Sequence, residues 1–561
     1  MKNVLLISIL TALVLAAQTP VVMTPASTGT SDTFQNYSKA NPAVPDADAD
    51  ADVEVPNTLY IPKPAPTAAR AQSPSSVTGA TSTMYIQTTN GTLPAAITAN
   101  YVGLGNGFNG WTNQGLLPSD TTLGVGNGQI VQWVNLRLTI LNKSTGAPLL
   151  SGSGYVQANQ VWAGLASTSI CRTQNNGDPT VQYDRLANRW ILHQFAFNST
   201  NTQNAFCFAV SQTNDATGAY NLYEYDFANS LPDYPKIGVW PDAYYITANN
   251  FAYPGGTYSG STVCAMDRAA MIAGTAATSV CFTAGSNADG EWFAAVPGDF
   301  EGTIAPPAGA AAYIVNGDWF NLNAPPYALR IRRFHVDFVT PANSTLDDGF
   351  GGGTGSFVNM PFATNVVGSC GDGGGQCVQQ PGTTRLLDTL SMRPMYRLAY
   401  RNLGANRESL VVTESVGKIG SANFAGIQLV EIRNPGANPP TIYNNVQFNP
   451  DTTNRWMGAA ASDKLGNIGM GYSVGSSTLS PGIRISGRLR NDIKSTLRGE
   501  MVVQTGSGSQ TSSAQRWGDY STMQIDPDDD CTFWFTTEYT NSTSAANWAT
   551  RIVSFRFNSC Q

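Results

Sequence analysis

The feature that most constrains this chain is a recurring unit of short, apolar segments that begins near residue 84. Segments such as VQWVNLRLTIL, RWILHQFAF and CTFWFTTEY are rich in β-branched and aromatic residues and are bounded by Gly, Asn, Asp or Pro, a pattern typical of strands. The candidate unit openings lie at Asp120, Asp178, Lys236, Asp299, Arg393, Arg455 and Arg516. Five of the six spacings between them are 58 to 63 residues and one is 94, so the sequence predicts seven copies of one supersecondary unit.

Each unit is long enough for four short antiparallel strands, the size of one blade of a β-propeller. Radial repetition of blades leaves only short, protected sheet edges. The last unit supplies three strands, so we expect a fourth from STMYIQTT or AITANYVGLG near the N-terminus. The prediction is an all-β, seven-bladed β-propeller over residues 84–561, with an N-terminal strand that closes the ring. A Gly-rich insertion at about residues 347–386 accounts for the long spacing.

The N-terminal part of the chain has a different composition. It starts with MKNVLLISILTALVLAAQ, in which a basic residue, an apolar core and small residues indicate a secretory signal over residues 1–17. Residues 18–83 are rich in Pro, Ala, Ser and Asp, which predicts a disordered linker or pro-segment. No later segment is long and apolar enough for a transmembrane helix. We therefore expect a secreted protein, either extracellular or held in the periplasm or at the cell surface.

Cysteine usage agrees with export. An even number of cysteines in an exported chain favours disulfides, and pairing of sequence neighbours would close loops within single units, although other connectivities stay open. The cysteines are Cys171, Cys207, Cys264, Cys281, Cys370, Cys377, Cys531 and Cys560. The absence of Cys-x-x-Cys and the presence of only 2 His disfavour zinc, a His-based triad and a redox cofactor.

The run from Ala459 to Tyr539, which includes ASDKLGNIGMGYSV and RWGDYSTMQIDPDDDCTFWFTTEY, resembles a set of exported bacterial propeller proteins that are largely uncharacterised. The resemblance is specific over roughly the last 110 residues and implies a propeller and secretion, without a settled activity. The chain is also distantly similar to sialidase-like propellers, because the turn from Ser462 to Asn467 partly matches theirs. No unit carries the full turn, so no sialidase residue is transferred.

Candidate site residues follow from the expected geometry, because the first strand of every blade lines the axis and its entry loop rims one mouth. Guanidinium groups there would grip an anionic group, carboxylates would supply acid, base or nucleophile, and aromatic rings would stack on sugars. The predicted ligand-binding residues are Arg393, Arg455, Arg516, Trp240, Trp456, Trp517 and Tyr520. The predicted catalytic residues are Asp178, Asp242 and Asp519.

These observations predict a secreted propeller that binds, and as an enzyme would cleave, extracellular polysaccharide, preferably anionic, as a glycoside hydrolase or polysaccharide lyase. One alternative is a non-catalytic surface or adhesion protein that uses the propeller as a platform for protein contacts. A second is that Arg and Asp of neighbouring blades merely pair and hold the ring in register. Glu414, Glu538 and His193 are interpreted as core residues.

The charge balance narrows the partners. A net charge of −7 disfavours nucleic acid, so the expected partner is a glycan or another cell-surface component. No cofactor is predicted with certainty. The run DPDDD has the composition of a Ca²⁺ loop without its ligand spacing, so a structural Ca²⁺ ion is a hypothesis only.

Overall fold

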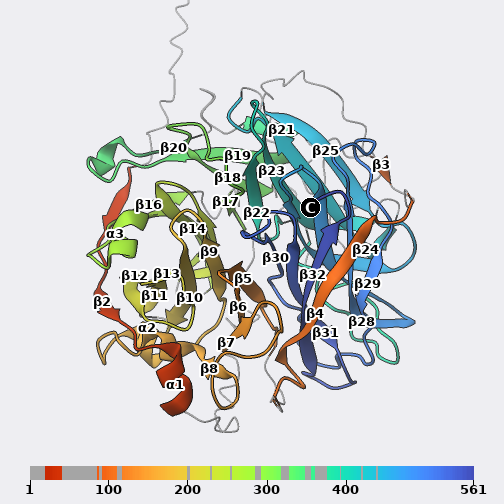
Figure 1. Ribbon diagram of the computed structural model, residues 1–561, viewed down its shortest axis with the longest axis horizontal. Coiled ribbons are helices and arrows are strands. Elements are labelled where there is room, and N and C mark those ends of the chain that lie inside the picture. The colour runs from red at the N-terminus through yellow and green to blue at the C-terminus, as the bar shows by residue number, and fades with distance from the viewer. Residues whose placement is uncertain are drawn as a thin grey trace, which may run out of the picture.

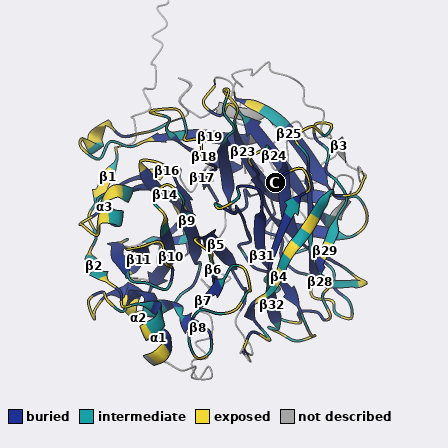
Figure 2. Cartoon of the chain, in the orientation of Figure 1, coloured by how far each residue is buried: buried dark blue, intermediate teal, exposed yellow. Residues whose placement is uncertain are grey.

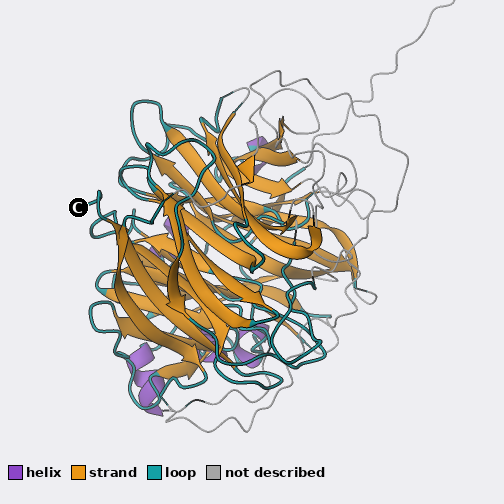
Figure 3. Cartoon of the chain, turned by 90° about the vertical axis from the view of Figure 1, so that its right-hand side faces the viewer, coloured by secondary structure: helices purple, strands orange, loops and turns teal. Residues whose placement is uncertain are grey.

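The computed structural model describes residues 19–40, 85–86, 91–109, 111, 117–198, 202–227, 230–252, 256–284, 292–317, 328–347, 356–359, 376–391, 393–418, 421–437 and 440–561. Strands run through these residues, and the helices are short segments (Figure 3). The α-helices are α1 (Phe34–Ala40), α2 (Ile170–Thr173) and α3 (Arg268–Ala273). The predicted all-β class is thus confirmed, whereas the predicted signal peptide lies outside the described residues.

The strands form successive antiparallel sets along the chain. The first set is β5 (Thr122–Gly126), β6 (Gln129–Val134), β7 (Arg137–Asn142) and β8 (Tyr155–Gln157). The second set is β9 (Thr180–Asp184), β10 (Arg189–Phe197), β11 (Asn204–Ser211) and β12 (Tyr220–Asp226). The third set is β13 (Ser230–Val239), β14 (Ala243–Ala252), β15 (Thr257–Asp267) and β16 (Ser279–Ala284).

The same order continues through the C-terminal half. The fourth set is β17 (Val296–Glu301), β18 (Ala312–Gly317), β19 (Ala328–His335) and β20 (Thr345–Asp347), with β21 (Ser356–Asn359) also on β19. The fifth set is β22 (Leu398–Asn402), β23 (Glu408–Lys418), β24 (Ser421–Arg433) and β25 (Thr441–Phe448). The sixth set is β26 (Asn454–Ser462), β27 (Ile468–Ser476), β28 (Leu479–Arg488) and β29 (Met501–Gln504). The last set is β30 (Thr522–Ile525), β31 (Phe533–Thr540) and β32 (Trp548–Phe557).

The first strands of these sets lie beside one another. β5 contacts β9, and each following first strand contacts the next one as far as β30, which contacts β5. The fourth and fifth sets are joined into one sheet by parallel pairing of β17 with β22. In Figure 1 these first strands lie near the centre of the molecule. Residues that precede them are therefore brought to one end of the molecule, although they are far apart in sequence.

An N-terminal strand completes the last set. β4 (Ala95–Gly105) pairs antiparallel with β32, with Asn100 opposite Val553. This is the strand that AITANYVGLG was expected to supply. The other candidate, STMYIQTT, contributes β3 (Tyr85–Ile86), which pairs in parallel with β25.

Residues 19–40 differ from the disordered linker or pro-segment predicted for residues 18–83. They form β1 (Val21–Met23) on β16, β2 (Ser27–Thr30) on β12, and α1. The prediction is based on the average composition of the segment, which is rich in Pro, Ala and Asp. Residues 19–40 are nevertheless ordered, because they pair with existing strands and the Phe34 side chain is fully buried. Residues 41–84 and most of the predicted Gly-rich insertion lie outside the described residues.

Apolar side chains of neighbouring strand sets pack together in shared clusters. The strands that carry them are largely buried, as their dark blue colour in Figure 2 shows. The disulfides Cys171–Cys207, Cys264–Cys281 and Cys531–Cys560 confirm the neighbour pairing for those cysteines, while Cys370 lies outside the described residues. Disulfides of this kind favour an oxidising, extracellular environment. Among the described residues, the helices are too short or too polar to cross a bilayer.

Candidate functional site

Four aspartates meet where the first strands begin. Asp120 precedes β5, Asp178 precedes β9, Asp233 lies at a bulge in β13, and Asp519 precedes β30. The backbone N–H of Asp519 donates to Oδ1 of Asp120 at 2.8 Å, across 399 sequence positions. The negative charges of Asp233 and Asp519 both act on Asp178. We call these four residues the carboxylate cluster, and this end of the molecule the entry mouth.

The local backbone explains why aspartate recurs here. Asp120 and Asp178 both adopt left-handed conformations, with φ of 43° and 48°. Most side chains disfavour this region, but Asp tolerates it because its short polar side chain forms local hydrogen bonds. The two residues occupy the same place in their units, two positions before the first strand. The first and second units thus each present an aspartate at the mouth from the same position.

Burial and the negative charges of neighbouring carboxylates raise the pKa values of Asp120, Asp178 and Asp233. The pKa of Asp178 is well above its usual range because of burial first, and then because of the negative charges of Asp233 and Asp519. Burial and the Asp519 charge raise the pKa of Asp233 to about 6. The pKa of Asp120 is raised for the same two kinds of reason. Protons are therefore shared within the cluster near neutral pH, so it offers both an acid and a base.

Two basic side chains border the cluster. Nη2 of Arg516 lies 2.7 Å from Oδ2 of Asp519, and both side chains are partly exposed. The ammonium group of Lys236 lies over the ring of Tyr234, 3.1 Å from its centroid. Burial, followed by the positive charge of Arg393, lowers the pKa of Lys236 well below its usual range. The entry mouth therefore combines carboxyl groups of raised pKa with basic side chains.

Arg393 also lies at the mouth, as predicted. Its guanidinium group lies 5.8 Å from the ring centroid of Tyr234 and 5.2 Å from that of Phe293. Cation–π contacts of this kind hold a guanidinium in place. Together, Arg393 and Arg516 are the two predicted arginines that the structure brings to the cluster.

Tyr520 lies beneath the cluster. Its hydroxyl donates to Oδ2 of Asp178 at 3.1 Å and is 3.0 Å from the carbonyl oxygen of Pro235. Its ring packs against Tyr234 at 5.3 Å and Tyr396 at 6.2 Å. Because Tyr520 is buried, it positions Asp178 and has no ring face open for a sugar.

The predicted tryptophans do not offer stacking surfaces. Trp456 and Trp517 are buried and pack on each other at 5.5 Å, and Nε1 of Trp517 donates to Ser473. Trp240 is buried between Tyr313 and Tyr400. These side chains are core residues, since the interfaces between strand sets need large apolar side chains.

Two further predicted residues lie elsewhere. Asp242 is in the turn after β13, at the opposite end of that strand from Asp233, and it accepts a hydrogen bond from Tyr245. Arg455 is buried and forms ion pairs with Asp451 at 2.8 Å and Glu500 at 2.7 Å. For Asp242, the repeat length places the residue in a unit but does not fix which end of a strand it occupies. Arg455 lies at the start of β26, and its ion pairs hold it against residues of its own strand set.

Some residues of the site were not among the predicted site residues. Asp120 and Lys236 were recognised only as unit openings, and Asp233 was not singled out. A usable signal existed, because Asp233-Tyr234 and Asp519-Tyr520 repeat the same dipeptide ahead of a first strand. Glu538 is a further case: it accepts a hydrogen bond from the N–H of Gly518 at 2.6 Å, and burial raises its pKa to about 7.

Below the mouth, the axis is filled by side chains from different strand sets. The amide of Gln524 donates to Gln182 at 2.6 Å, and Gln182 donates to the hydroxyl of Tyr396. In the next layer, Arg397 pairs with Asp299 and with Glu301. Asp299 therefore agrees with the alternative prediction, in which Arg and Asp side chains of neighbouring units form ion pairs around the axis.

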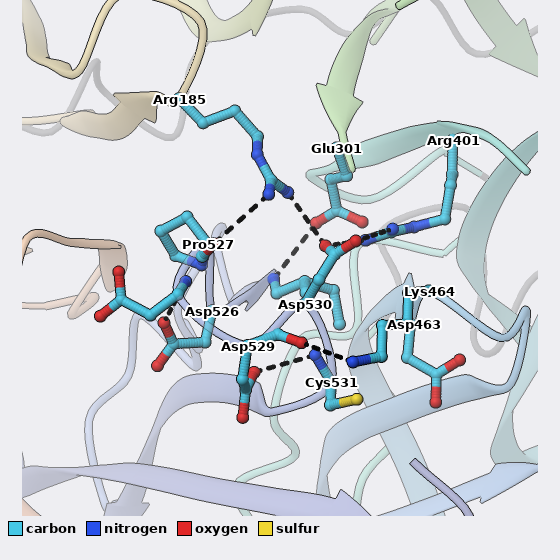
Figure 4. Close-up of polar contacts among 12 residues, drawn as sticks. Arg185, Glu301, Arg401, Asp463, Lys464, Asp526, Pro527, Asp529, Asp530 and Cys531 are labelled. Carbon is cyan, nitrogen blue, oxygen red and sulfur yellow. Dashed lines mark hydrogen bonds and ion pairs between the residues drawn. The ribbon is translucent and has the colours of Figure 1, made fainter. Parts of the chain in front are cut away.

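The far end of the axis is closed by the turn between β30 and β31. Figure 4 shows Arg185 and Arg401 approaching Asp530 from two sides, and the N–O distances are 3.0 Å and 2.8 Å. Lys143 pairs with Asp526 of the same turn at 2.8 Å. The described residues contain no group of three or more His, Cys, Asp or Glu side chains arranged to hold a metal ion. The DPDDD run is thus engaged in ion pairs with other strand sets.

No protein-family model and no curated protein matches the sequence. Solved structures with some likeness include the GH93 α-L-arabinofuranosidase of Fusarium graminearum with arabinobiose (TM-score 0.34, 9% identity, 82% of this chain and 97% of that one). The Penicillium chrysogenum α-L-arabinanase gives a TM-score of 0.34 at 8% identity, over 83% of this chain and 100% of that one. The Trypanosoma rangeli sialidase gives 0.29 at 10% identity, over 68% and 54%.

Proposed function

We propose that the protein is a secreted seven-bladed β-propeller that binds a polysaccharide at the entry mouth and hydrolyses a glycosidic bond there. The contact of β30 with β5 and the pairing of β4 with β32 support a closed ring. The observation that carries the function is the carboxylate cluster, in which Asp178 accepts from Tyr520 and Asp519 pairs with Arg516. A structural ion pair alone has no need of three further carboxyl groups, those of Asp120, Asp178 and Asp233, whose pKa values are raised by burial and by neighbouring negative charges.

The chemistry needs one protonated and one ionised carboxyl group. In glycoside hydrolysis, one group donates a proton to the leaving oxygen as the C–O bond breaks, and the other takes a proton from the attacking water. We assign the acid to Asp178, because burial and its neighbours raise its pKa. We assign the base to Asp519, because Arg516 pairs with its carboxylate. Burial, followed by the negative charges of Asp233 and Asp519, sustains the raised pKa of the acid.

The charge balance of the mouth supports a neutral glycan. The prediction of an anionic ligand depended on three arginines, and Arg455 is instead engaged with Asp451 and Glu500. The described residues at the mouth include four aspartates beside Arg393, Arg516 and Lys236. Because Arg516 is already paired with Asp519, little unpaired positive charge is left for an anionic sugar, whereas a neutral sugar accepts hydrogen bonds from the basic side chains and donates them to the carboxyl groups.

The test is a screen of neutral and anionic polysaccharides for binding and for release of reducing ends. We expect neutral polymers to be cleaved by the wild type, and Asp178→Asn to bind them without cleavage. Asp242→Asn is the matched control, because Asp242 lies at the other end of β13. Retention of glycans without any cleavage by the wild type would favour the adhesion alternative. Equal loss of cleavage in both variants would contradict the assigned site.

A further inference from the structure

The outer strands of the units differ in length and in whether another strand covers them. Those covered by an N-terminal strand are long: β25 has 8 residues, β12 has 7 and β16 has 6. Three outer strands without such cover among the described residues are short: β8 and β20 have 3 residues each and β29 has 4. The outer strand of the last set, β4, has 11 residues and comes itself from the N-terminal part of the chain. Since long, unpaired edges invite association with other chains, β1, β2 and β3 lie on edges that need protection.

Residues 19–40 cover two of the long edges and then continue to a third unit. β1 pairs antiparallel with β16, and β2 pairs antiparallel with β12, with Gly29 opposite Leu222. The side-chain amide of Gln35 then donates to the carbonyl of Leu149 at 2.6 Å, and the N–H of Ser151 donates to Ser38 at 3.1 Å. We call residues 19–40 the strap; it lies along the outside of the first three units (Figure 1).

The strap is held by specific features in addition to backbone pairing. Phe34 is fully buried and packs edge-on against Tyr220, with the ring centroids 5.4 Å apart. Ser31 exchanges two hydrogen bonds with Tyr220, one through its own N–H and one through its hydroxyl. The side chain of Phe34 therefore acts as an anchor, and the strands set its register.

A close backbone approach adds sequence selectivity. A Cβ atom at Gly29 would lie 2.3 Å from the carbonyl oxygen of Gly164, and one at Gly164 would lie 2.0 Å from that of Thr30. Both distances are far below a normal contact, and the obstructing atoms are backbone. Only a segment with glycine at this register fits, whereas the neighbouring Thr28 is exposed and tolerates change.

We infer that the edges of β12 and β16, with the pocket for Phe34, form a peptide-binding seam whose ligand is the strap itself. The seam takes an extended segment with glycine at one register position and an aromatic residue five positions later. Non-covalent contacts are sufficient to hold this segment. The strap therefore stays bound if the chain is cut after residue 40. This inference is independent of the chemistry at the entry mouth.

The experiment uses the full chain with a site for a specific protease inserted between residues 41 and 84. After folding and cleavage, the strap fragment is expected to co-elute with the remainder in size-exclusion chromatography. Excess labelled peptide of residues 19–40 is expected to replace it, and the Gly29→Val peptide to bind at least about tenfold more weakly. The Thr28→Val peptide is the matched control and should bind like the parent.

Several results would overturn the seam. Separation of the fragment from the remainder would show that the contacts do not hold it. Equal binding of the Gly29→Val and Thr28→Val peptides would show that close approach to Gly164 does not select the segment. A second variant that lacks residues 19–40 adds a further readout: we expect it to associate through β12 and β16, and added parent peptide to restore the original elution volume. Failure of the peptide to do so would also contradict the inference.

Discussion

The hydroxyl of Tyr520 donates a hydrogen bond of 3.1 Å to the carboxylate of Asp178, although 342 positions separate the two residues. Tyr520 precedes the first strand of the last unit, and Asp178 precedes that of the second. Such a long-range contact depends on tertiary structure, in which the first strands lie beside one another. The fold therefore determines the site, and changes to the ring and changes to the cluster are distinguishable by experiment.

Replacement of the proposed acid is the most direct test of the chemistry. We expect Asp178→Asn to lower kcat/KM by about 10²- to 10⁴-fold, the usual contribution of general acid–base catalysis. The melting temperature at neutral pH should not fall, because the substitution removes a carboxyl group whose charged form is disfavoured by burial. Initial rates and calorimetry on the same preparation check both expectations. Unchanged rates would remove Asp178 from the site.

Two arginines that the sequence placed in the same role should behave differently. Arg455→Ala removes a buried guanidinium group that pairs with Asp451 and with Glu500, of which Glu500 keeps Arg484 as a partner, and we expect it to destabilise the fold by about 1–3 kcal/mol. Arg516→Ala removes a partly exposed side chain and should lower activity with a much smaller effect on stability. Urea unfolding followed by tryptophan fluorescence, together with rate measurements, separates the two. Equal stabilities would contradict the structural role of Arg455.

Buried carboxyl groups near the mouth predict a decline of stability with rising pH. Burial raises the pKa of Glu414 from 4.5 to about 7, so the folded state holds a proton that the unfolded state has lost between these values. The contribution of Glu414 to the free energy of unfolding is fully present below pH 4.5 and is lost as the pH rises through 7. The total loss is on the order of 3 kcal/mol. Glu414→Gln should therefore be more stable than the wild type at pH 8 and similar to it at pH 4.5. A constant difference across this range would show that Glu414 does not titrate in this way.

The strand from the N-terminus should be essential for the ring. A Cβ atom at Gly103 of β4 would lie 2.3 Å from Oγ1 of Thr550, so Gly103→Val should force β4 away from β32. Overpacking of this kind costs about 1–3 kcal/mol, and deletion of residues 84–104 should give an insoluble or molten protein. Val102→Thr is the matched control, because Val102 is 42% exposed. Near-ultraviolet circular dichroism and solubility measure the outcome, and a deletion that melts like the parent would contradict the role of β4.

The sequence predicted the strands well because period-two patterns bounded by turn residues occur in almost every unit. The unit spacing also predicted a common location at one end of the molecule for five residues that each precede a first strand: Asp178, Asp519, Arg393, Arg516 and Tyr520. It did not separate Arg455 from this group. A bulge between Trp456 and Ala459 shifts the register of β26, and a spacing of about 60 residues carries no information on such a shift.

Other features depend on contacts that no local pattern encodes. Asp242 and Asp233 are close in sequence, yet β13 separates them by the length of a strand. The strap was not predicted because its partners β12 and β16 follow about 200 residues later, and its own strands have only 3 and 4 residues. Its order comes from pairing with an existing edge, which only the complete fold provides.

The filled axis has a kinetic consequence. Gln182, Gln524 and Arg397 connect different strand sets below the mouth, and Asp530 closes the far end. A sugar released at the cluster has no path through the centre and leaves by the route along which the polymer arrived. Short reaction products should therefore act as competitive inhibitors, and turnover should slow as they accumulate.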